Sequence, residues 1–412
     1  MSSPTRDPDY DAALASYEAG LADLTRDRLQ AVLRRFPPSV PALLLAGVVE
    51  AQHLRLDAAL GFFDRALALQ PGNPRAQFNK AAVLLQRGEW EAGLPLYESR
   101  WALAEFRPVP PFPTGPTPWR GRELLAGKTI LLRCEQGMGD TLQFCRYVPL
   151  LAARGAEVVL VAQRPLVTLL ADLPGVTRII TDGAAEPACD FECPLLSLPL
   201  AFGTTPTSIP QQSAYLISDA GKVSEWRSRL GPATALRIGL TWQGTAKHVH
   251  DRHRSLSLQQ LLAHLPREHE YHSLQKQLPA SEARLLRAQP WIADHAPDLH
   301  DFSDTAALCA CLDLIITVDT SVAHLSAGLG KPTWILLHHS AGWRWLLDRN
   351  DTPWYPSAIL FRQRQLHDWS EVCTRVGLSL RRQISSARDT GLLSIEPQQG
   401  PNVSRVTTPA LY

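Results

Sequence analysis

The spacing of apolar and polar positions changes twice along the chain. Residues 1–106 show the apolar periodicity of helices. Residues 107–127 contain six prolines, which exclude a helix or a central strand and predict a stiff linker. From residue 128 onward, strand-like apolar runs alternate with helical patterns. This alternation fades near residue 385, so we expect residues 385–412 to form a disordered tail.

The mixed part predicts an α/β fold with two Rossmann-like lobes. The first lobe, residues 128–218, carries the runs KTILLRC, EVVLVA and TRIITD. The second lobe, residues 219–384, carries LRIGLTWQG, EYHSLQK, LDLIITVD and PTWILL. Runs without polar alternation are typical of parallel strands covered on both faces. Two successive doubly wound units predict a cleft between the lobes, with ligands beyond the carboxyl ends of the strands.

The helical part has an internal period of 34 residues, which separates Pro37 from Pro71. Between them stand Gly47, which permits close helix approach, and Phe63, an aromatic wedge. Residues 1–106 resemble the tetratricopeptide repeat family, whose stacked helix pairs form a concave surface for a partner chain. The alternative interpretation is that the helices only brace the next domain.

Composition narrows the classes of function. The chain has 41 basic and 40 acidic residues, so no global field favours nucleic acid or an anionic membrane. Residues 1–20 lack the pattern of a secretory signal, and no apolar run approaches the roughly 18 to 20 residues of a transmembrane segment. We therefore expect a cytoplasmic protein. Its seven cysteines lie mostly in apolar runs, which indicates reduced core thiols and not a disulfide framework or a zinc site.

The loop CEQGMGD follows the first strand of the first lobe. Gly137 and Gly139 allow a sharp turn and a close approach to the backbone. The third glycine and the lysine of nucleotide-binding loops are missing. Asp140 is a candidate general base facing the cleft, or a cap of the following helix. Glu135 is the alternative base.

A second candidate segment is LDLIITVDTSVAHLSAGLGKP. A buried strand ends at Asp319, Thr320 and Ser321 begin a helix, and His324 lies one turn further along the same face. Free backbone N–H groups and the positive helix end at this position suit a diphosphate. The alternative is that Asp319 and Thr320 only cap the helix and that His324 packs inside it.

A cationic loop, residues 241–257, follows the first strand of the second lobe. Its cations are Lys247, Arg252 and Arg254, and arginine pairs bidentately with phosphate oxygens. Its histidines are His248, His250 and His253. Their irregular spacing favours a solvated loop over a metal site.

Three further residues stand at strand ends on the same expected edge. Gln243 stands next to the end of the run LRIGLTWQG, and Gln275 with Lys276 ends EYHSLQK. These side chains are candidates for contacts with a ribose or a phosphate.

The motifs GMGD, DRHRS and VDTSVAHLSAGLGKP resemble, in order and separation, the signature regions of glycosyltransferase family 9, the lipopolysaccharide heptosyltransferase family. The resemblance covers residues 128–376, about 60% of the chain. A more distant similarity is to the O-linked N-acetylglucosamine transferases, which also join helical repeats to a two-lobed transferase. The resemblance implies the glycosyltransferase-B architecture and an inverting, metal-independent enzyme without a cofactor.

The resemblance also implies roles for individual residues. The family's general base falls on Asp140, and its phosphate-binding lysine falls on Arg254. The family's residues at the donor diphosphate correspond to Asp319, Thr320 and His324. Phe302 stands where a side chain covers the nucleotide base. The family's acidic ribose contact is not matched at Gln275 or Lys276, which leaves the nucleotide open.

We therefore expect a hexosyl- or heptosyltransferase that uses a nucleotide diphosphate sugar and a protein or glycan acceptor held by the repeats. A rival interpretation is a non-catalytic repeat scaffold with degenerate transferase lobes. A third is a nucleotide-sugar epimerase, which would not need a peptide-binding surface.

Overall fold

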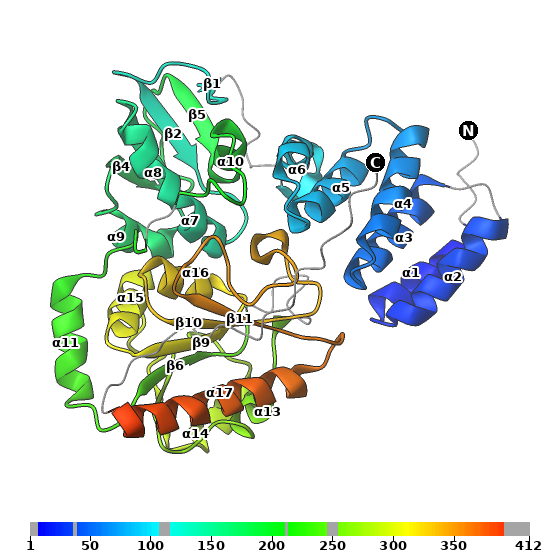
Figure 1. Ribbon diagram of the computed structural model, residues 1–412. Coiled ribbons are helices and arrows are strands. Elements are labelled where there is room, and N and C mark those ends of the chain that lie inside the picture. The colour runs from blue at the N-terminus through cyan, green and yellow to red at the C-terminus, as the bar shows by residue number, and fades with distance from the viewer. Residues whose placement is uncertain (1–6, 36–38, 107–115, 211–212, 245–253, 391–412) are drawn as a thin grey trace, which may run out of the picture.

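The chain folds into a helical segment and two α/β lobes (Figure 1). The computed structural model describes residues 7–35, 39–106, 116–210, 213–244 and 254–390. In Figure 1 the lobes stand one above the other, and the blue helices of the segment project to one side. The predicted α/β class, with two Rossmann-like lobes in the glycosyltransferase-B arrangement after a helical segment, is confirmed.

The helical segment packs sequence neighbours against each other, with α1 on α2, α3 on α4 and α5 on α6. Its bounds are α1 Pro8–Glu18, α2 Ala22–Arg35, α3 Val40–Gln52, α4 Leu56–Leu69, α5 Pro74–Gln86, α6 Trp90–Tyr97, and the 3-10 helices η1 Glu98–Ala102 and η2 Ala104–Phe106. A Cβ atom on Gly47 would overlap the ring of Phe63, so the close approach of α3 and α4 requires glycine there. These pairs fit the predicted repeats, although Pro37 lies outside the described residues, and their tetratricopeptide identity stays a prediction.

The first lobe is a parallel sheet in the order β1-β5-β2-β3-β4. Its elements are β1 Thr117–Pro118, β2 Thr129–Arg133, α7 Met138–Phe144, η3 Cys145–Tyr147, α8 Val148–Ala152, β3 Glu157–Ala162, η4 Arg164–Leu166, α9 Val167–Leu170, β4 Val176–Thr181, β5 Phe191–Pro194, η5 Leu195–Ser197 and α10 Leu198–Ala201. The linker prediction for residues 107–127 was wrong in its described part. There β1 forms the edge of the sheet, and Trp119 and Leu125 are buried in the core.

The second lobe is a parallel sheet in the order β11-β10-β9-β6-β7-β8. Its elements are α11 Ala220–Leu230, β6 Arg237–Thr241, α13 Leu258–Leu262, β7 Glu270–Ser273, α14 Ala280–Arg287, β8 Ile292–Asp294, α15 Phe302–Ala310, β9 Leu314–Val318, α16 Ser321–Gly328, β10 Thr333–Leu337, η6 Trp343–Trp345, β11 Ala358–Arg362 and α17 Trp369–Thr390. The predicted start of the tail at residue 385 was wrong, because α17 continues to Thr390. Residues 391–412 lie outside the described part.

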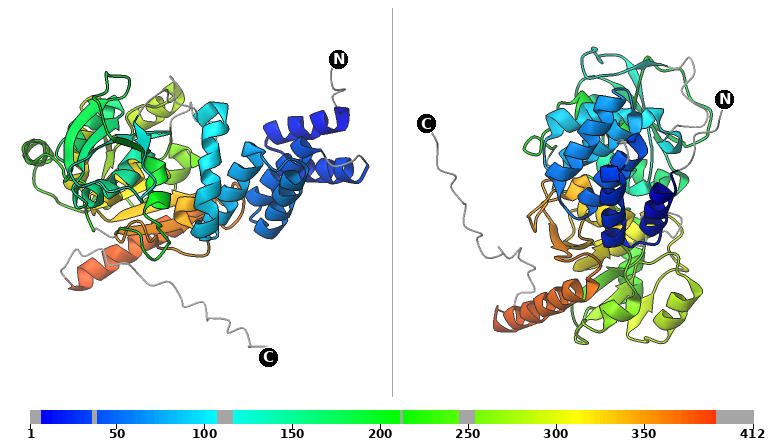
Figure 2. Two further views of the ribbon diagram at one scale, coloured as in Figure 1. Left: turned by 90° about the horizontal axis from the view of Figure 1, so that it is seen from above. Right: turned by 90° about the vertical axis from the view of Figure 1, so that its right-hand side faces the viewer.

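An aromatic cluster joins the helical segment to both lobes. Trp90 of α6 stacks on Trp354 of the second lobe at 5.4 Å and meets the edge of Trp343 at 5.6 Å between ring centroids. Phe144 of the first lobe contacts both of these rings, and Tyr97 contacts Trp343. All five side chains are at most 6% exposed. The outer helices α1 and α2 extend away from this junction, as Figure 2 shows.

A buried arginine also ties the lobes together. Arg146, at the end of the α7 region, donates to the backbone carbonyl of Trp354 at 2.7 Å and to the Tyr215 hydroxyl at 3.1 Å. Its guanidinium also lies over the rings of Tyr215, Trp354 and Tyr355. Aromatic faces and carbonyl oxygens can hold a desolvated cation in this way.

Two histidines, His272 and His295, stack on each other in the second lobe. His272 on β7 and His295 lie with Nδ1 and Nε2 3.0 Å apart. Burial and, to a smaller extent, the neighbouring His295 lower the pKa of His272 from 6.5 to about 4. At a pH above 6.5, the pKa of histidine in the unfolded chain, both states hold His272 neutral. As the pH falls from 6.5 toward 4, the unfolded chain takes up a proton that the folded chain does not, and the free energy of unfolding falls.

We expect the free energy of unfolding to fall by roughly 2 kcal/mol between pH 7 and pH 5 through His272. Guanidinium unfolding at the two pH values would measure this loss. His272→Gln should reduce the pH dependence, whereas His300→Gln, at an exposed position, should keep it. An unchanged dependence in His272→Gln would show that another group is responsible.

In the described part of the chain, no helix combines the length and apolar character needed to cross a membrane.

Candidate active site

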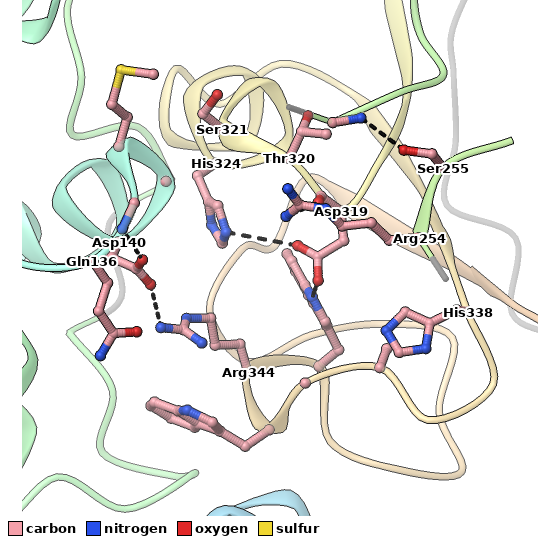
Figure 3. A pocket seen from close by; sticks show the side chains of 18 of the residues that line it. Gln136, Asp140, Arg254, Ser255, Asp319, Thr320, Ser321, His324, His338 and Arg344 are labelled. Atoms are coloured by element: carbon pink, nitrogen blue, oxygen red, sulfur yellow. Dashed lines mark hydrogen bonds and ion pairs between the residues drawn. The ribbon is translucent and has the colours of Figure 1, made fainter. Parts of the chain in front are cut away.

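One cavity of about 2330 Å³ lies between the lobes and extends along the helical segment. Its walls include twelve of the residues predicted for the site, namely Gly137, Gly139, Asp140, Gln243, Arg254, Gln275, Lys276, Phe302, Asp319, Thr320, Ser321 and His324. Figure 3 shows Asp140 facing His324 and Asp319 across this space. The structure therefore brings the candidates together, while their individual roles stay predictions.

Asp140 both caps α7 and faces the cavity. Its Oδ2 accepts a hydrogen bond from the backbone N–H of Gly137 at 2.9 Å, an arrangement that fixes the turn between β2 and α7. Its Oδ1 accepts from Nη2 of Arg344 (Figure 3). The two interpretations of Asp140, as helix cap and as a group facing the cleft, are thus compatible.

Glu135, the alternative base, is held in a buried ion pair with Arg100 of η1. Nε and Nη2 of Arg100 donate to its two oxygens at 2.8 and 2.9 Å, and the backbone N–H of Leu196 adds a third bond at 3.0 Å. Arg100 is 0% exposed and the Glu135 side chain 7%. Glu135 therefore anchors the Asp140 loop to the helical segment and is poorly placed to accept a proton.

Arg344 is a site residue that the sequence analysis missed. It lies on η6, in the loop after β10, and reaches from the second lobe to Asp140 of the first. Its guanidinium is 5.0 Å from the ring centre of Trp343. No sequence motif identifies Arg344. It could have been found only because it follows β10, a strand that is parallel to β9 and ends at the same sheet edge as Asp319.

The start of α16 presents donors to the cavity. Thr320 is the N-cap residue and makes no side-chain capping bond, so its hydroxyl does not occupy the helix end. Arg254 donates from Nη1 to the backbone carbonyl of Asp319 at 3.2 Å and so lies beside this end. Asp319 accepts from the indole N–H of Trp345 at 2.9 Å. The arrangement combines a cation with a positive helix end, as an anion site requires.

His324 is buried beneath this helix end. Its Nδ1 lies 2.8 Å from the Tyr355 hydroxyl, and its ring stacks on Trp345 at 5.3 Å. Burial lowers the pKa of His324 to about 3, although Asp319 opposes the shift, so the imidazole is neutral at neutral pH. A Cβ on Gly139 would stand 2.8 Å from Cδ2 of His324. Gly139 is therefore required where the two lobes touch.

The strand-end residues are engaged within the chain. The Gln275 amide donates to the backbone carbonyl of Gln243 at 3.0 Å and accepts from the N–H of Gln243 at 3.3 Å, so it bridges β6 and β7. Lys276 donates to the carbonyl of Ala296 at 3.1 Å. Phe302 begins α15 and is partly buried against the core.

The predicted cations Lys247 and Arg252 and the histidines of the same loop lie outside the described residues. Within the described part, no three His, Cys, Asp or Glu side chains gather as metal ligands would. All seven cysteines are free thiols.

No protein-family model matches the chain. A curated relative, protein FlbA of Caulobacter vibrioides, is 26% identical over 358 residues. This match covers 79% of the chain but only 59% of FlbA, so the chain spans about three fifths of that relative.

Three solved structures that are similar to the chain are those of glycosyltransferases. The ADP-heptose lipopolysaccharide heptosyltransferase II of Escherichia coli has a TM-score of 0.45 and 16% identity, covering 63% of this chain and 99% of its own. A glycosyltransferase family 9 protein of Veillonella parvula has a TM-score of 0.44 and 11% identity, covering 66% and 92%. A variant of the O-GlcNAc transferase of Thermobaculum terrenum has a TM-score of 0.30 and 14% identity, covering 94% and 93%.

Proposed function

We propose that the chain is an inverting, metal-independent glycosyltransferase that moves a sugar from a nucleotide diphosphate sugar to a hydroxyl group. The observation that carries the proposal is the shared cavity. Its first-lobe wall holds the carboxylate of Asp140, and its second-lobe wall holds Arg254 and the start of α16. A carboxylate thus faces a cation and a positive helix end across one space, and this supports a displacement of a diphosphate.

In the proposed reaction, an acceptor hydroxyl attacks the anomeric carbon of the donor in line with the departing group. The new bond joins the acceptor oxygen to that carbon, and the hydroxyl proton passes to Asp140. The bond from the carbon to the diphosphate oxygen breaks, and its electron pair leaves on that oxygen. Arg254 and the N–H groups at the start of α16 stabilise the negative charge. A single in-line displacement inverts the anomeric configuration.

The acceptor is proposed to be a protein or glycan that reaches the site along the helical segment. The same cavity is lined by Phe78 and Asn79 of α5 and by Trp101 of η1. A long acceptor on these helices would therefore enter the space in front of Asp140 without crossing the surface of either lobe.

Arg254→Ala is expected to weaken nucleoside diphosphate binding, because a charge-assisted bond to phosphate is worth about 1.5–3 kcal/mol. This corresponds to roughly ten- to hundredfold in the dissociation constant. Calorimetric titration would measure it. Arg349→Ala is the control, since Arg349 pairs with the exposed Asp351. Unchanged affinity in Arg254→Ala would remove Arg254 from the phosphate site.

The proposed function is tested by screening nucleotide diphosphate sugars for thermal stabilisation of the chain, then assaying each hit for hydrolysis and transfer. Stabilisation by one donor class, followed by release of its nucleoside diphosphate, supports the transferase. No stabilisation by any donor would favour the rival proposal, a non-catalytic repeat scaffold. The observation that favours the scaffold is that Asp140 is already paired with Arg344.

A further inference from the structure

The ion pair between Arg344 and Asp140 stands in the middle of the proposed reaction space. The two side chains are 15% and 17% exposed, so the pair is largely withdrawn from water. It crosses from one lobe to the other (Figure 3). Oδ1 is bonded to Arg344 and Oδ2 to the N–H of Gly137, so an acceptor hydroxyl would have to compete with Arg344 for Oδ1.

Arg344 keeps unused capacity for a second anion. Its Nε is buried without a hydrogen-bond partner. Such a donor is costly to leave unpaired, and a guanidinium fork can bond two phosphate oxygens at once. The side chain lies in the same cavity wall as Arg254 and the start of α16. An anion bound at the start of α16 would therefore be attracted by the positive charge of Arg344.

The loop that carries Arg344 is held from outside the second lobe. Gln86 of α5 donates to the backbone carbonyl of Ala341 at 2.8 Å, and Trp343 is fixed in the aromatic cluster by Trp90. The loop is therefore anchored just before Arg344, and Trp345 anchors it just after, because its indole N–H donates to Asp319. A change of partner would need rotation of the long Arg344 side chain only.

We propose that Arg344 is a further donor-binding residue, which exchanges Asp140 for the donor's diphosphate and thereby frees the carboxylate to act as the base. This inference rests on the proposed function. It explains why the resting pair is compatible with catalysis: a diphosphate carries more negative charge than one carboxylate and offers more acceptor oxygens. The base is then released only when a donor is in place.

The exchange makes Asp140 a competitor of the ligand, and this has an unusual consequence. Removing the carboxylate should tighten nucleoside diphosphate binding, because Arg344 no longer has to leave a partner. If the pair is formed most of the time, Asp140→Asn should bind a nucleoside diphosphate roughly three- to tenfold more tightly than the unchanged chain. Asparagine retains the oxygen that caps α7.

The test is a double-mutant cycle read by calorimetry with ADP, GDP, UDP and CDP, each beside its monophosphate. We expect Arg344→Gln to weaken binding of the preferred diphosphate by roughly ten- to hundredfold and to leave monophosphate binding within about twofold. Asp140→Asn should tighten diphosphate binding, and this gain should vanish in Asp140→Asn with Arg344→Gln. Arg349→Gln serves as the matched control, on a partly exposed arginine that pairs with Asp351.

The selective loss of the diphosphate over the monophosphate is a result that a merely structural role of Arg344 would not produce. If the unchanged chain binds a diphosphate but Arg344→Gln binds it equally well, the inference is overturned and the proposed function stands. If the unchanged chain binds no nucleotide, both proposals fail. If Arg344→Gln does not fold, the test rests on Asp140→Asn. Diphosphate binding by Asp140→Asn that is unchanged or weaker would then overturn the inference.

Discussion

Asp140→Asn is expected to abolish sugar transfer while the chain still binds its nucleotide. Loss of a general base typically lowers turnover by about 10²- to 10⁴-fold. Asparagine is nearly isosteric and preserves the cap on Gly137, so the loop should keep its shape. The two quantities to compare are the turnover number with saturating donor and acceptor, and the dissociation constant of the nucleoside diphosphate.

The matched control for this variant is Asp182→Asn, because Asp182 lines the same cavity without belonging to the candidate set. Its turnover should stay within about threefold of the unchanged chain, as for a residue outside the catalytic constellation. Equal turnover in Asp140→Asn and Asp182→Asn would remove Asp140 from the reaction and leave the cavity as a binding site only.

Arg100→Met is expected to be the most destabilising single change outside the hydrophobic core. It would leave Glu135, which is 7% exposed, as a buried charge without its cation. Breaking a buried ion pair in this way costs about 3–5 kcal/mol. Chemical unfolding monitored by circular dichroism would give the loss. Because Glu135 belongs to the loop that carries Asp140, transfer should also fall before the chain unfolds.

Two further variants isolate the cause. Arg75→Met breaks an ion pair with Glu105 in which both side chains are at least 40% exposed, and it should cost no more than about 1 kcal/mol. Arg100→Met combined with Glu135→Gln removes the orphaned charge and should recover part of the stability. A loss in Arg100→Met no greater than that in Arg75→Met would show that the buried pair does not hold the segments together.

The two-lobed fold could be predicted because most of its strands coincide with runs identified in the sequence. β2, β3, β6, β7, β9 and β10 fall within such runs, and β4 begins one residue before its run. The missed strands are short or lie at edges. β1 spans two residues and exists only through its pairing with β5, and β5 contains the buried Glu192, which is paired with Arg133. Neither pairing leaves a signal within the strand's own sequence.

The candidate site divides in the same way. Asp140 and the start of α16 follow buried strands directly, and parallel strands bring such positions to one edge. Arg344 and Arg100 come from segments whose place is set by packing over long separations. Arg344 is positioned by the aromatic cluster and Arg100 by docking of the helical segment. Local periodicity carries no information on either.

The aromatic cluster also bears on how such a chain can evolve. The prolines mark a division in the sequence, yet α5 and α6 share their buried faces with both lobes. A recombination event near residue 107 would expose buried tryptophans to solvent on each product and would separate Arg100 from Glu135. Helices α1 and α2, which pack on each other and on α3, can be exchanged or multiplied more freely. We therefore expect descendants of this gene to vary in the number of outer helices and to inherit α5, α6 and the lobes as one unit.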